Sequence, residues 1–174
     1  MRKNWKKRAL CAVLFILCTG LLGCGGSYQE LSKGVDAPDF TAELNNHESF
    51  ILSEQQGRVV LLNFWATWCS PCVEEMPALQ QIYDEYGKQV EVIAVNCAED
   101  KKVVDRFIEE KGYTFPVAYD ETNEIAEKYP SAGIPYTLVI GKDGRVTEVF
   151  TGAQSSDVQY KAFRRAIKEA VENS

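Results

Sequence analysis

Apolar and polar positions along this chain follow two different periods in turn. The apolar runs at residues 58–65 and 90–96 are nearly continuous, which predicts strands buried on both faces. Between them, apolar residues recur every three or four positions over residues 73–86. This spacing predicts a helix that ends near Gly87 and is kinked at Pro77. The strand–helix–strand order indicates an α/β domain.

The alternation continues toward the C-terminus. We expect a helix, a strand and a short helix at residues 101–111, 115–119 and 122–129 respectively. Two more strands, at residues 136–140 and 145–150, flank a Gly-Lys-Asp-Gly sequence that is a strong signal for a hairpin turn.

The two ends of this pattern complete the predicted domain. Residues 39–44 and 49–52 flank a polar Asn-Asn-His-Glu turn and predict a hairpin. Asp157 is the expected N-cap of a last helix. The apolar stripe of that helix consists of Phe163, Ile167 and Val171. Together the elements predict an α/β fold with a central mixed sheet covered by helices on both sides.

The N-terminus has the pattern of an export signal. Basic residues precede an apolar stretch at residues 9–22, which is too short for a comfortable membrane span. The sequence Leu-Leu-Gly-Cys, ending at Cys24, resembles a bacterial lipobox, where cleavage precedes a lipid-carrying cysteine. An ordinary signal peptide or an uncleaved anchor are the alternatives. We expect a lipoprotein signal peptide at residues 1–23, a lipidated tether at 24–34 and one domain at 35–174.

The charge balance argues against two classes of partner. The chain carries 19 Lys and Arg against 25 Asp and Glu, a formal net charge of −6. Loss of residues 1–23 removes five basic and no acidic residues, which changes the charge to −11. A domain this acidic is a poor candidate for binding nucleic acid or anionic lipid, so its membrane link would be the lipid itself.

The six cysteines fall into three groups. The first three lie in or directly after the N-terminal apolar segment: Cys11, Cys18 and Cys24. Cys69 and Cys72 form a close pair. Cys97 stands alone as an expected small buried hydrophobic residue, and a role as a redox partner is the alternative. One close pair cannot cross-link a domain of about 140 residues, which excludes a disulfide-stabilised scaffold.

The Cys69–Cys72 pair stands at the start of a predicted helix. Unpaired backbone N–H groups and the helix dipole favour the thiolate at the first cysteine, and the thiolate is the species that attacks disulfides. A zinc half-site or a buried, inert pair is the alternative. Zinc takes four ligands, however, and the chain has a single histidine, His47, and no second Cys-x-x-Cys.

The sequence around this pair resembles the thioredoxin fold. Asn-Phe-Trp-Ala-Thr-Trp-Cys-Ser-Pro-Cys at residues 63–72 is followed about sixty residues later by Gly-Ile-Pro at 133–135. The pattern Cys-x-x-Cys-x-x-Glu-x-Pro, and Ala-Pro-Asp-Phe at 37–40 with its hairpin, are similar to the membrane-attached bacterial thiol-disulfide oxidoreductases of the TlpA/ResA type. The resemblance covers residues 35–174 and includes a central helix–strand insertion at 99–121.

The resemblance implies roles in the disulfide chemistry for three residues and sets a fourth apart from thioredoxin. Cys69 would be the attacking nucleophile and Cys72 the resolving cysteine. Glu75 would shuttle the proton of the resolving thiol and raise the thiol pKa values, although a solvated carboxylate on the helix face is the alternative. Asn63 stands where thioredoxin itself has a buried aspartate, and an asparagine cannot relay a proton.

Other residues near the pair would bind substrate. Pro135 is expected to follow a cis peptide bond, so that the Ile134 backbone pairs with an extended substrate. A trans proline that opens a strand is the alternative. Ser70 and Pro71 carry no charge, which favours a more reducing couple. The expected apolar docking patch consists of Trp68 and Tyr136, above Trp65, although all three could belong to the core.

The sequence therefore predicts an oxidoreductase that needs no organic cofactor and no metal. The resemblance implies a protein that is lipid-anchored to a bacterial cell membrane and faces outside the cytoplasm. Disulfides of secreted or membrane proteins would be its substrates, with apocytochrome c as the leading client. The electron donor would be a membrane thiol-disulfide carrier of the DsbD/CcdA kind.

Two other functions stay open. Ala-Pro-Asp-Phe also opens peroxiredoxins, which are thiol peroxidases, but those place a threonine three residues before the reactive cysteine, whereas Thr67 lies two before Cys69. A redox-inert or haem-chaperoning binding module is the second alternative. The intact cysteine pair argues against inertness, and one histidine and two methionines offer little to bind haem.

Overall fold

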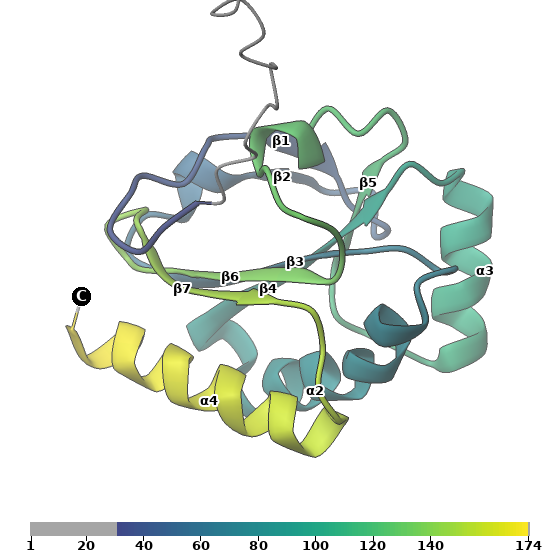
Figure 1. Ribbon diagram of the computed structural model, residues 1–174. Helices are drawn as coiled ribbons and strands as arrows, with labels where there is room; N and C mark the ends of the chain where they lie inside the picture. Colours follow the sequence, from purple (N-terminus) through teal and green to yellow (C-terminus); the bar gives the residue numbers. More distant parts are fainter. Residues whose placement is uncertain (1–30, 174) are drawn as a thin grey trace, which may run out of the picture.

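A computed structural model describes residues 31–173 (Figure 1). Its central sheet has the strand order β5-β4-β3-β6-β7. Strands β3 (Val59–Trp65), β4 (Val90–Cys97) and β5 (Val117–Asp120) are parallel, and β6 (Tyr136–Ile140) and β7 (Val146–Thr151) are antiparallel to their neighbours. The predicted mixed sheet is confirmed, and the predicted signal peptide and Cys24 lie outside the described residues.

Three α-helices pack on one face of this sheet. Helix α2 (Ser70–Tyr86) connects β3 to β4, α3 (Lys101–Lys111) connects β4 to β5, and α4 (Ser156–Asn173) follows β7. Parallel neighbours need such crossovers because a hairpin can join only antiparallel strands. All three helices contribute buried side chains to one hydrophobic cluster, and α2 and α4 lie side by side beneath the sheet (Figure 1).

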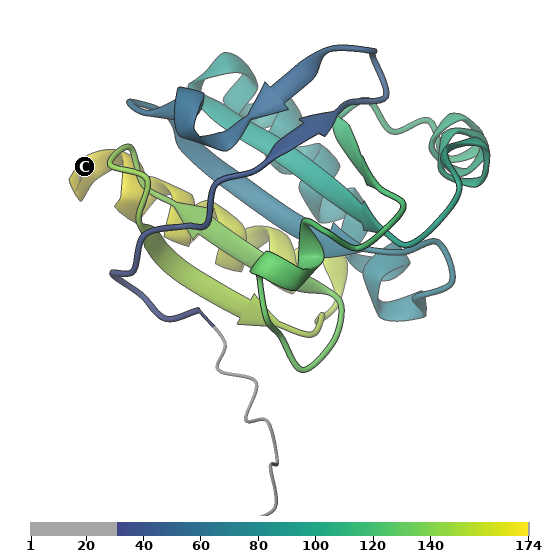
Figure 2. The same cartoon turned by 90° about the horizontal axis from the view of Figure 1, so that it is seen from above.

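The opposite face is covered differently. The predicted hairpin forms from β1 (Thr41–Glu43) and β2 (Ser49–Ile51), and Figure 2 shows it above the sheet. The short 3-10 helices η1 (Leu52–Gln55) and η3 (Ala126–Lys128) complete this layer, and a second hydrophobic cluster fills the space beneath. Within residues 31–173, α-helices therefore cover only one face of the sheet. The expectation of helices on both faces is not met on the second face, where the hairpin and two short 3-10 helices lie instead.

Several predicted boundaries shift for local reasons. The strand predicted at 115–119 begins two residues later, because Pro116 has no N–H to donate to a neighbouring strand. The helix predicted at 122–129 is reduced to η3. Asp157 lies in the first turn of α4, so its assignment as the N-cap is wrong. Helix α2 runs unbroken through Pro77 and is followed by η2 (Gly87–Gln89).

Both edges of the sheet are covered by N-terminal segments. The N–H groups of Gly34 and Ala37 donate to Val146 and Gly144 at the β7 edge over 2.7 and 3.0 Å. At the other edge, Leu44 forms a bridge with β5. Such cover keeps the unpaired strand edges from pairing with other chains. Among the residues described, none of the helices has the length and apolar character that a membrane crossing requires.

Candidate active site

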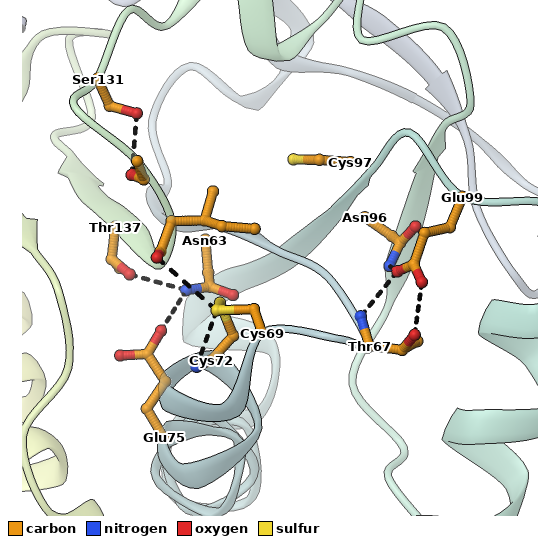
Figure 3. Close-up of a disulfide and its surroundings, with 12 residues drawn as sticks. Asn63, Thr67, Cys69, Cys72, Glu75, Asn96, Cys97, Glu99, Ser131 and Thr137 are labelled. Atoms are coloured by element: carbon orange, nitrogen blue, oxygen red, sulfur yellow. Dashed lines mark hydrogen bonds between the residues drawn. A yellow bond between two sulfur atoms is a disulfide. The ribbon is translucent and has the colours of Figure 1, made fainter.

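The Cys69–Cys72 pair lies where the chain passes from β3 into α2 (Figure 3). A disulfide joins the two residues, with an S–S distance of 2.06 Å. Cys69 is the N-cap of α2, and its Sγ accepts a hydrogen bond of 3.3 Å from the Cys72 N–H. Cys69 is 6% exposed, whereas Cys72 is completely buried. Cys69 is therefore the sulfur that a substrate reaches first, as its predicted role requires.

The loop before β6 encloses the other side of the disulfide. The peptide bond between Ile134 and Pro135 is cis, which confirms the prediction. The Ile134 carbonyl oxygen lies 3.7 Å from Cys69 Sγ, so a reduced Cys69 thiol can donate a hydrogen bond to it. The Pro135 carbonyl accepts a hydrogen bond of 2.9 Å from the Gly152 N–H, which fixes the loop to the end of β7.

Glu75 lies one turn after Cys72 on α2 and has no exposed surface. Residues three apart on a helix share a face, so Glu75 lies on the face of α2 that carries Cys72. Asn63 donates a hydrogen bond of 2.7 Å to Glu75 Oε1 (Figure 3). Burial raises the pKa of Glu75 from 4.5 to about 8, against the lowering effect of the Asn63 hydrogen bond. The solvated-carboxylate alternative is therefore wrong, and this carboxyl can exchange a proton near neutral pH.

The surface around Cys69 is partly the predicted one. Trp68 is 72% exposed, and Ser70 and Pro71 are also exposed beside the disulfide. Trp65 is buried against Phe107, as expected for a residue beneath the site.

Tyr136 does not belong to this surface, and its prediction as an exposed docking residue is wrong. Its side chain is completely buried in the cluster on the opposite face, where its ring lies 6.2 Å from that of Phe64. The reason is the two-residue period of β6, because Thr137 points toward Asn63 and its neighbour must point away.

Glu99 was missed by the sequence analysis. Its carboxylate accepts hydrogen bonds of 2.7 Å from the Thr67 N–H and 2.8 Å from Asn96 Nδ2, and another from the Thr67 hydroxyl (Figure 3). Glu99 thus holds the loop that carries Trp68 and Cys69. A signal was available, because β3 and β4 are parallel and the residues that follow such strands meet at one edge of the sheet. The Thr67 hydroxyl is engaged by Glu99, which argues against the thiol peroxidase alternative.

Cys97 has the buried environment that was expected. It belongs to the hydrophobic cluster on the face opposite the disulfide, and burial raises its thiol pKa to about 12. A thiol so reluctant to ionise is a poor nucleophile. In residues 31–173, no group of three or more His, Cys, Asp or Glu side chains is placed to hold a metal ion.

Known proteins share this arrangement. The Redoxin family matches residues 32–166. The chain is 41% identical over 129 residues to the thiol-disulfide oxidoreductase ResA of Geobacillus kaustophilus, covering 73% of this chain and 74% of that protein. It is 37% identical over 171 residues, or 96% of each chain, to ResA of Halalkalibacterium halodurans. This chain belongs to the ResA thiol-disulfide oxidoreductases.

Solved structures agree with the ResA assignment. A crystal structure from Chlorobium tepidum, of a protein described as a thiol:disulfide interchange protein DsbE, has a TM-score of 0.74 and 31% identity. It covers 82% of this chain and 99% of that one. The fold is therefore thioredoxin-like, and the chain, like other ResA proteins, is a thiol-disulfide oxidoreductase whose reactive disulfide is the Cys69–Cys72 pair.

Proposed function

We propose that this oxidoreductase works as a reductase outside the cytoplasm. A lipid on Cys24 would hold it at a bacterial membrane, where it reduces disulfides in secreted or membrane proteins, with apocytochrome c as the client. The position of Glu75 is the observation that supports reduction of the client rather than its oxidation, because Glu75 is fully buried one turn after Cys72. Below about pH 8 a mostly protonated Glu75 brings no positive charge that would stabilise a nearby thiolate, and once ionised it opposes one. The uncharged Ser70 and Pro71 do not compensate. A dithiol with poorly stabilised thiolates gives up its electrons more readily.

The reaction proceeds by two thiol–disulfide exchanges. The Cys69 thiolate attacks one sulfur of the client disulfide, which forms a mixed disulfide and releases the other client sulfur as a thiolate. The Cys72 thiolate then attacks Cys69 Sγ, which forms the Cys69–Cys72 disulfide and releases the second client sulfur as a thiolate, which takes up a proton from solvent. Two electrons pass to the client. Glu75 accepts the proton that Cys72 loses, because it lies on the same face of α2 and titrates near neutral pH.

The oxidised enzyme must then be reduced again. A membrane thiol-disulfide carrier of the DsbD/CcdA kind would supply two electrons and become a disulfide itself. Every electron transfer in this scheme is a thiol–disulfide exchange, so the scheme requires no organic cofactor and no metal. The client would pair as an extended segment with the Ile134 backbone and contact the exposed Trp68, and the haem-attachment segment of apocytochrome c has the short Cys-x-x-Cys disulfide that such a site accepts.

Cysteine variants test this proposal. The probe is an oxidised peptide containing Cys-x-x-Cys-His, incubated with the fully reduced full-length protein in detergent. We expect Cys69→Ala to lose all peptide reduction and Cys72→Ala to accumulate a mixed disulfide that mass spectrometry detects. The matched control Cys97→Ala should keep the wild-type rate, because Cys97 lies on the far face of the sheet.

Three results would count against the proposal. Peptide reduction by Cys69→Ala at the wild-type rate would remove Cys69 from the reaction. A Cys69–Cys72 potential more oxidising than that of the peptide would reverse the proposed direction. Hydrogen peroxide turnover at an enzymatic rate would favour a thiol peroxidase instead.

A further inference from the structure

We propose that Asn63 and Thr137 are positioning residues, which fix the Glu75 side chain beneath the disulfide and set the pH range in which it exchanges its proton. The inference rests on the proposed function only in taking Glu75 as the acid–base group of the cysteine pair. Its evidence is a chain of three buried polar side chains from three different elements.

The three side chains are held in register by the fold. Asn63 on β3 and Thr137 on β6 are directly opposite each other in the antiparallel pair, so both point to the face that carries α2. Asn63 Nδ2 donates to Thr137 Oγ1 over 2.8 Å and to Glu75 Oε1 over 2.7 Å. Figure 3 shows the amide between the two acceptors. All three residues are at most 1% exposed, so water does not reach them readily.

The Asn63 amide uses both of its N–H groups in these two bonds. Glu75 Oε2 and Asn63 Oδ1 are buried and have no hydrogen-bond partner among the residues described. An ionised Glu75 therefore has a single donor, the Asn63 amide, to stabilise its charge. A hydrogen bond to the ionised form favours that form, so Asn63 keeps the proton exchange of Glu75 from moving to still higher pH. An aspartate at this position would be a second acid and, once ionised, would have no proton to donate.

Among residues 31–173, no charged side chain shifts the pKa of Glu75 by its charge. On its own helix, Cys72 lies one turn before Glu75 and can titrate once the disulfide is reduced, and the adjacent Glu74 is exposed. Strands β3 and β6 face Glu75 with the neutral groups of Asn63 and Thr137. Helix α4 packs against α2 with the buried apolar residues Phe163 and Ile167. Burial and the Asn63 hydrogen bond are the two influences on the Glu75 pKa.

The test measures the ionisation of Glu75 directly. The full-length protein, labelled with ¹³C in glutamate and kept reduced, is titrated by NMR, and Glu75→Gln identifies the Glu75 carboxyl signal. We expect Asn63→Ala to raise the titration midpoint by about one pH unit or more, because a buried hydrogen bond to a charged group is lost. Thr137→Val should raise it less, because the Asn63 amide then loses only the hydrogen bond to Thr137 and can still donate to Glu75. Thr137→Ser keeps the hydroxyl and should leave the midpoint unchanged.

A second readout connects the titration to the cysteines and needs no client. The rate of Cys69 alkylation by iodoacetamide is followed against pH, and Asn63→Ala should displace this profile in the wild type but not in a Glu75→Gln background. Midpoints that stay within about 0.3 units in both Asn63→Ala and Thr137→Val would overturn the proposal. If Asn63→Ala does not fold, the comparison of Thr137→Val with Thr137→Ser decides alone. A normal Glu75 response with no reduction of client would instead refute the proposed function.

Discussion

At the scale of single residues, Glu75 makes folding stability depend on pH. Its pKa is about 8 in the folded protein, against 4.5 as the ordinary value. Between these values the folded state keeps a proton that the unfolded state has released. Stability from this group is therefore fully present below about pH 4.5 and is lost as the pH rises through about 8. The loss is on the order of a few kcal/mol.

We expect Glu75→Gln to remove this dependence, because a glutamine amide stays neutral and still accepts the Asn63 hydrogen bond. Urea denaturation of the oxidised protein between about pH 5 and pH 8 measures the free energy of unfolding. The wild type should lose stability with rising pH relative to the variant. Glu74→Gln, on the exposed side of α2, is the matched control and should keep the wild-type slope. Identical slopes for the wild type and Glu75→Gln would mean that Glu75 holds no such proton.

The residues of the site differed in how far the sequence could predict them. Cys69, Cys72 and Pro135 belong to short motifs whose geometry is local, so their placement followed from the chain itself. The depth of Glu75 depends on how α2 is rotated against β3 and β6, which no local pattern states. Tyr136 was assigned to the wrong face, because its side-chain direction depends on the phase of β6 in the sheet.

At the scale of elements, the α3–β5 insertion is connected to the active-site loop through Glu99. This residue follows β4 after Ala98, whose φ of 56° is in the left-handed region and turns the chain at the end of the strand. The Glu99 carboxylate then accepts both donors of Thr67, one residue before the exposed Trp68. The insertion thereby fixes the loop that carries the exposed Trp68.

Replacing this carboxylate should affect binding more than chemistry. We expect Glu99→Ala to raise the KM for the oxidised peptide while kcat changes little, because Trp68 loses its fixed position. The free energy of unfolding should fall by about 1–3 kcal/mol, since three hydrogen bonds to a carboxylate are lost. Glu110→Ala, on the exposed face of α3, is the control for both measurements. An unchanged KM alongside the lower stability would limit Glu99 to a structural role.

The helices and strands were predictable where the hydrophobic period agrees with the glycine or proline that ends the element. Helix α3 occupies the predicted residues and ends at Gly112, whose φ of 71° suits glycine. The predicted helix at 122–129 is shortened to η3 by local hydrogen bonds from the side chain of the last residue of β5. The Asp120 carboxylate accepts the N–H groups of Ile125 and Ala126, which favours a turn over a continuous helix.

At the scale of the whole molecule, the chain enters the domain far from the disulfide. Gly34 and Ala37 pair beside the turn that follows β6, and that turn lies at the start of β3. The disulfide follows the other end of β3, about 20 Å away along a seven-residue strand (Figure 1). If Cys24 carries the lipid as proposed, the chain that leads from it joins the domain at the end opposite the disulfide.

Because the N-terminal entry of the chain and the disulfide lie at opposite ends of the domain, we predict that the proposed lipid on Cys24 is needed for membrane location and for reduction of the Cys69–Cys72 disulfide by the donor, but not for the reaction with the client. We expect purified Cys24→Ala to reduce the soluble peptide at the wild-type rate, because the disulfide lies at the opposite end of the domain. In bacterial cells the variant should leave the membrane fraction and lose incorporation of a palmitate analogue. Its Cys69–Cys72 pair should accumulate as the disulfide, which alkylation trapping measures, since the membrane donor no longer meets it. Cys18→Ala is the matched control. A Cys24→Ala protein that keeps both the label and its membrane location would show that another residue or segment provides the anchor.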